Sequence, residues 1–64
     1  MDVESGMSRD DLLHLLVTGE TCYRYGNPVF VVGLRPESGG KDTHHWLVTI
    51  RDSDNRREIY VKTQ

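Results

Sequence analysis

The chain has 64 residues, a formal net charge of −2 and a single cysteine. A chain of this length forms one domain and buries only roughly 60% of the surface that its unfolded form exposes, so we expect a small margin of stability. One thiol cannot form an internal disulfide, which favours a reducing compartment, and we expect a cytoplasmic protein. The apolar runs are far shorter than the ~20 residues of a membrane span, and no signal segment is recognisable, so neither membrane insertion nor export is expected.

The N-terminal part of the chain predicts a polar tail followed by one helix. Residues 1–7 show no apolar periodicity, and we expect a flexible tail there, ahead of a single domain at residues 8–64. Ser8 is a favourable N-cap residue, and Gly19 supplies a left-handed stop. These signals predict a helix over Arg9–Thr18, which is too short to be stable without packing against the rest of the domain.

Four short runs rich in β-branched and aromatic residues follow the helix, and they predict four strands. The runs are Thr21–Tyr25, Pro28–Leu34, His45–Arg51 and Glu58–Thr63. The fold class is therefore α+β, with one N-terminal helix followed by a four-stranded antiparallel meander. Because the second run is apolar at successive positions, both of its faces are apolar, and the alternative is a sheet curled into a small SH3-like barrel. The segment 35–43, with its proline and glycines, is expected to form a mobile loop.

The two hairpins each have a candidate two-residue turn. Gly26–Asn27 is the expected turn of the first hairpin, with glycine in the first position. A turn centred on Asp54–Asn55 pairs Ile50 with Ile59 in the last hairpin and separates charged from aliphatic residues. The predicted inner face of that hairpin consists of Trp46, Val48, Ile50, Ile59 and Val61.

Side chains that could carry chemistry are few and badly spaced. The potential metal ligands are Cys22, His14, His44 and His45. Adjacent histidines on a strand point to opposite faces, and no two ligands have the spacing of a known zinc motif, so no metal is expected. The chain also lacks a glycine-rich phosphate loop and a nucleophile with a neighbouring base. We therefore expect no cofactor and no enzymatic activity.

The predicted helix is more apolar than one sheet face can cover. Its aliphatic residues form two edges, Leu12 with Leu16 and Leu13 with Val17, whose members are four positions apart. We expect one edge to remain exposed and to bind a protein partner or a second copy of the chain as a homodimer. The expected function is that of a small non-enzymatic interaction protein, a regulator or inhibitor that binds a larger cytoplasmic macromolecule. Phages and mobile elements often encode such proteins.

The alternative is a small nucleic-acid-binding module that uses the last hairpin. Residues 1–20 hold five acidic residues and one arginine, a net charge of −4, whereas residues 21–64 hold seven cationic and five acidic residues, a net charge of +2. The candidate residues are Arg51, Arg56, Arg57, Tyr60 and Lys62. Such side chains stack on bases and hold phosphates. Because acidic neighbours dilute this charge, we expect only weak binding and favour the protein partner.

Overall fold

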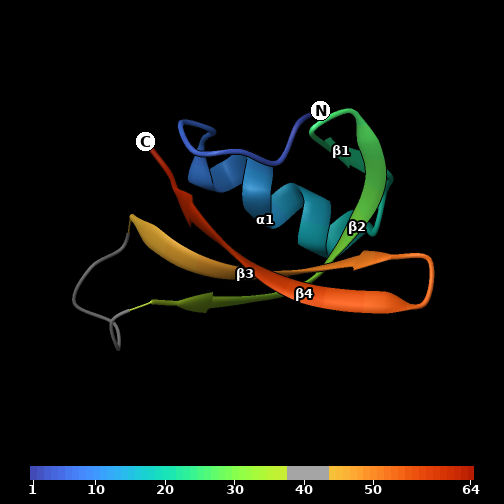
Figure 1. Cartoon of the computed structure of the whole chain (residues 1–64). Coiled ribbons are helices and arrows are strands. Elements are labelled where there is room, and N and C mark those ends of the chain that lie inside the picture. Colours follow the sequence, from blue (N-terminus) through green and yellow to red (C-terminus); the bar gives the residue numbers. More distant parts are fainter. Residues whose placement is uncertain (38–43) are drawn as a thin grey trace.

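The computed structural model of the chain describes residues 1–37 and 44–64 (Figure 1). Helix α1 (Arg9–Thr18) is followed by the strands β1 (Cys22–Arg24), β2 (Asn27–Pro36), β3 (His45–Asp52) and β4 (Asn55–Lys62). The strands form an antiparallel sheet in the order β1-β2-β3-β4, which confirms the predicted α+β fold. The sheet is bent, but it does not close into a barrel, since within the described residues β1 and β4 remain its two edges. Most of the expected loop at 35–43 lies outside the described residues.

Helix α1 begins and ends where its capping residues predict. The Ser8 hydroxyl accepts a hydrogen bond from the backbone N–H of Asp11 at 3.1 Å, which satisfies one of the free donors of the first turn. Gly19 has a φ of 68°, and its N–H donates to the carbonyl oxygen of Leu15. This left-handed conformation ends the helix, because only glycine adopts it without steric cost.

The first hairpin turns one residue earlier than predicted. Arg24 pairs with Asn27, so the turn is Tyr25–Gly26 rather than Gly26–Asn27. Both turn residues have positive φ values, 51° and 80°, as in a type I′ turn, whose twist matches that of the flanking strands. The prediction placed glycine in the first turn position, whereas the structure uses it in the second.

The last hairpin turns at Ser53–Asp54, which is also one residue earlier than predicted. Ile50 consequently pairs with Arg57 rather than with Ile59. Side chains alternate between the two faces of a strand. A shift of two residues in the pairing of β3 with β4 therefore leaves every side chain on its predicted face. The predicted inner face is therefore confirmed: Val48, Ile50 and Val61 are buried, and Trp46 and Ile59 are half-buried against them.

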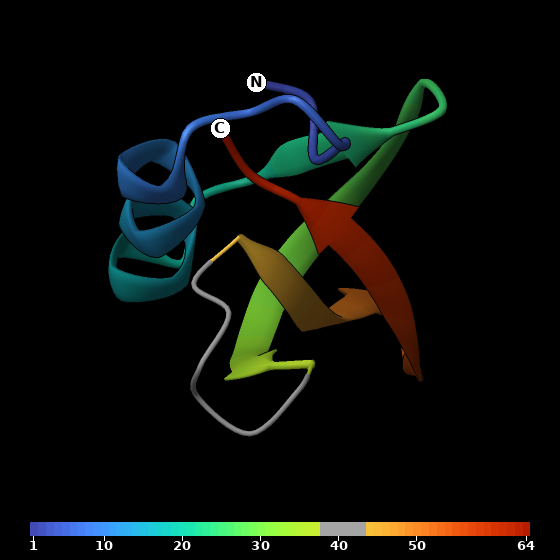
Figure 2. The same cartoon turned by 90° about the vertical axis from the view of Figure 1, so that its left-hand side faces the viewer.

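The core lies between α1 and the inner face of the sheet. Its fully buried apolar residues are Val3, Leu12, Leu15, Cys22, Val29, Val31, Val48, Ile50 and Val61. Figure 2 shows α1 and the N-terminal segment on the same side of the sheet. In the part of the chain that the structure describes, no element covers the opposite face, which we call the outer face.

Residues 1–7 differ most from the prediction, because they pack instead of forming a loose tail. Val3 is 1% exposed and belongs to the core, and its N–H donates to the carbonyl oxygen of Tyr23 on β1 at 2.8 Å. The Gly6 N–H donates to the carbonyl oxygen of Lys62 on β4, also at 2.8 Å. The segment thus contacts both edges of the sheet. A single buried valine in a polar run leaves no periodic signal, which explains why the sequence did not predict this packing.

Candidate interaction surfaces

The two aliphatic edges of α1 differ sharply in exposure. Leu12 is completely buried, and Leu16 is half-buried against the core. Leu13 is 38% exposed and Val17 is 82% exposed. Leu12 therefore cannot contact a partner, which corrects its assignment as a binding residue, and Leu16 mainly supports the core. The exposed pair, Leu13 and Val17, is called the helix ridge below.

Charged side chains border the helix ridge. By helical spacing, Arg9 and Asp10 lie one turn before Leu13, and both are exposed. His14 directly follows Leu13, and its Nε2 atom lies 3.4 Å from Oε1 of Glu20. Within residues 1–20, which carry a net charge of −4, the ridge is thus an apolar strip in an acidic region.

The outer face of the sheet carries most of the residues proposed for nucleic acid. Four of the five share this face by strand alternation: Arg51, Arg56, Tyr60 and Lys62. Arg57 pairs with Ile50 and therefore lies on the opposite face, near the turn. Arg51 stands directly opposite Arg56, an unfavourable pairing of like charges. The side chain of Tyr60 is 67% exposed.

Two residues of β2 complete the outer face, and the sequence prediction missed both. The guanidinium carbon Cζ of Arg51 lies 4.7 Å from the ring centroid of Phe30, a cation–π contact. Nη2 of Arg35 lies 2.9 Å from Oε2 of Glu58. Arg51 also donates to the carbonyl oxygen of Ser53 at 3.0 Å. Two cations of this face are therefore held by neighbouring groups, which reduces what they offer to a phosphate.

The chemistry-bearing residues remain apart in the structure. The Cys22 thiol is buried and donates to the carbonyl oxygen of Val29 at 3.4 Å, and burial raises the pKa of this thiol. Such a thiol is a poor nucleophile. Within residues 1–37 and 44–64, no group of three or more histidine, cysteine or acidic residues is arranged to hold a metal ion. In the same part of the chain, no helix has the length and apolar character needed to cross a membrane.

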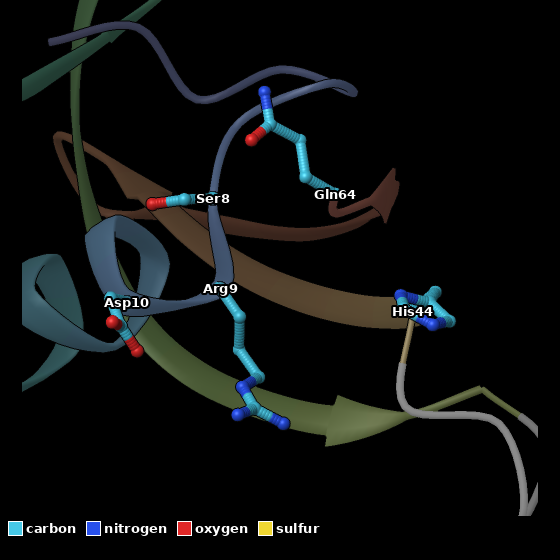
Figure 3. Close-up of a pocket in the computed structure, with 5 residues that line it drawn as sticks. All are labelled: Ser8, Arg9, Asp10, His44 and Gln64. Atoms are coloured by element: carbon cyan, nitrogen blue, oxygen red, sulfur yellow. The ribbon is translucent and has the colours of Figure 1, made fainter.

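A pocket of about 320 Å³ lies beside the N-terminus of α1 (Figure 3). It is lined by Ser8, Arg9, Asp10, His44 and Gln64. The labelled side chains point in different directions, and the Ser8 hydroxyl already caps the helix. Because no set of polar groups converges on one point, the pocket does not define a ligand.

Comparisons with known proteins leave the function to be argued from these surfaces. No family model matches the chain, and no match is found among curated proteins or solved structures.

Proposed function

We propose that this chain is a small non-enzymatic interaction protein of the cytoplasm, which regulates or inhibits a larger macromolecule by occupying a surface on it. The observation that carries the proposal is the exposure of the helix ridge, above all of Val17 at 82%. A ten-residue helix depends on burying its apolar side chains, so aliphatic residues left in water on such a helix are a cost to the free protein. Contact with a partner removes that cost.

The partner that fits this ridge is a protein with an apolar groove and a cationic rim. Leu13 and Val17 are four residues apart and so form two successive anchors, as in the helix-in-groove mode of recognition. Asp10 and Glu20 place negative charge near the ridge, against one exposed cation, Arg9, and the net charge of residues 1–20 is −4. Charge complementarity of this kind accelerates association and selects among partners more than it adds affinity.

The test compares two lysine substitutions. Val17→Lys changes the ridge, whereas Thr21→Lys adds the same charge at an exposed position between α1 and β1. Both variants should keep the circular dichroism spectrum and nearly the same unfolding midpoint, since surface substitutions shift stability by about 0.5 kcal/mol or less. Partners captured from a lysate and confirmed with purified proteins should be lost with Val17→Lys alone. Equal binding by both variants would refute the role of the ridge.

The second candidate is a nucleic-acid-binding module on the outer face of the sheet. The observation in its favour is that Phe30 and Tyr60 share this face with four cationic residues, one of which is already paired with Glu58. Fluorescence anisotropy with single-stranded DNA and RNA should give dissociation constants weaker than about 1 µM at physiological salt. Tighter binding that is lost in Arg56→Glu and in Tyr60→Ala would place this function ahead of the first.

A further inference from the structure

The edge of the sheet formed by β4 has backbone groups that point away from the domain. β4 is the last strand in the sheet, and among the strands of residues 1–37 and 44–64 it pairs with β3 alone. At its end, the Lys62 N–H donates to the hydroxyl of Ser5 at 3.1 Å, and the Lys62 carbonyl oxygen accepts from the Gly6 N–H. The N–H and C=O groups of Lys62 therefore face away from β3.

The same orientation recurs at every second residue of an antiparallel strand, so it applies to Tyr60, Glu58 and Arg56. Among residues 1–37 and 44–64, no group bonds to the outward N–H and C=O groups of these three residues. The N-terminal segment covers the edge only at Lys62. Figure 2 shows β4 along the margin of the sheet, with its C-terminal end nearest to the N-terminal segment.

The side chains along this edge give it a definite chemical character. Arg56 and Tyr60 lie on the outer face, and Arg57 and the half-buried Ile59 lie on the opposite face. The carboxylate of Glu58 is paired with an arginine of β2 at 2.9 Å. The part of the edge near the turn therefore carries an arginine on each face, beside Asp52 and Asp54, and the part near Ile59 and Tyr60 is apolar and aromatic.

We propose that the β4 edge binds an extended acidic segment of another protein, which adds to the sheet as a fifth strand. Three outward-facing residues match an added strand of about five residues, or roughly 17 Å. Acidic residues of the added strand would lie opposite Arg56 and Arg57, and apolar residues opposite Ile59 and Tyr60. Antiparallel pairing of two copies over the same three residues would place the two Glu58 side chains opposite each other, an unfavourable pairing of like charges.

The test uses a fluorescein-labelled peptide of eight residues, acidic in one half and rich in valine in the other. A second peptide has the same sequence with alternate backbone amides N-methylated, which keeps the charge but prevents ladder hydrogen bonds. The first should bind in fluorescence anisotropy titrations up to about 1 mM, and the second at least about tenfold more weakly. Bound peptide should also slow amide hydrogen exchange at Arg56, Glu58 and Tyr60.

Charge reversal provides the matched comparison. Arg56→Glu should weaken peptide binding about tenfold or more, whereas Arg9→Glu, the same change on an exposed residue of α1, should leave it unchanged. Equal binding of the two peptides, no binding of the first peptide, or dimerisation that protects the β4 amides without peptide would each overturn the proposal. The helix ridge takes no part in this site, so such a failure leaves the proposed function untouched.

Discussion

Replacing Val3 by alanine tests whether the N-terminal segment is part of the folded domain. The side chain is 1% exposed, so Val3→Ala removes two methyl groups from the core. Their transfer to water costs roughly 0.8 kcal/mol each, and the cavity left behind adds to this. We expect a loss of about 1.5 to 3 kcal/mol. A core of this size supplies roughly 3 to 5 kcal/mol in total, so the loss would be a large fraction of the stability.

The loss can be measured by urea unfolding followed through the fluorescence of Trp46. This side chain is half-buried, and its Nε1 donates to the Thr63 hydroxyl at 3.1 Å, so its signal reports on the folded sheet. The midpoint should fall while the slope stays constant. Val17→Ala deletes the same atoms at an exposed helix position and should change the midpoint little. If Val3→Ala shifts the midpoint no further than this control, residues 1–7 are the loose tail that the sequence predicts.

Three further predictions concern the interior of the sheet. Ile50→Ala should cost about 2 to 5 kcal/mol and Ile50→Val about 0.5 to 1.5 kcal/mol in urea unfolding, because the side chain is fully buried, and unchanged midpoints would contradict its place in the core. The buried Cys22 should react with thiol reagents far more slowly in the folded protein than in urea, and equal rates would contradict its burial. Burial raises the pKa of the Cys22 thiol, so the unfolded chain loses the thiol proton at a lower pH than the folded protein. The free energy of unfolding should therefore decline as the pH rises through the ordinary thiol pKa, and this decline should be smaller in Cys22→Ala.

The parts of the fold that the sequence predicted well are those with local determinants. Ser8 and Gly19 cap the helix through contacts within a few residues, and both helix boundaries were correct. The turn of the last hairpin was predicted one residue too late, because the run 52–55 offers more than one two-residue turn. The predicted and observed pairings of β3 with β4 differ by two residues, and a shift of two keeps each side chain on its face. The apolar pattern that identifies the inner face therefore cannot select between these two registers.

The candidate surfaces depend on contacts between distant segments, and here the sequence was less informative. It identified two aliphatic edges on the helix, but which of them is buried depends on how α1 lies against β2. It found Arg51 and Tyr60 on one face, but it missed Phe30, because the register between β2 and β3 includes an irregularity between Val31 and Gly33. Neither the length of the linking segment nor the apolar pattern fixes that register.

The contact between the N-terminal segment and β4 has a consequence for the order of folding. Ser5 and Lys62 are 57 positions apart, so their contact closes a loop of nearly the whole chain. Helix α1 and the two hairpins need only nearby residues, and non-local contacts form more slowly. We therefore expect the N-terminal segment to dock last, after the sheet has formed. Until then the outward groups of Lys62 are also open, and this is the interval in which one chain can most readily pair with the edge of another.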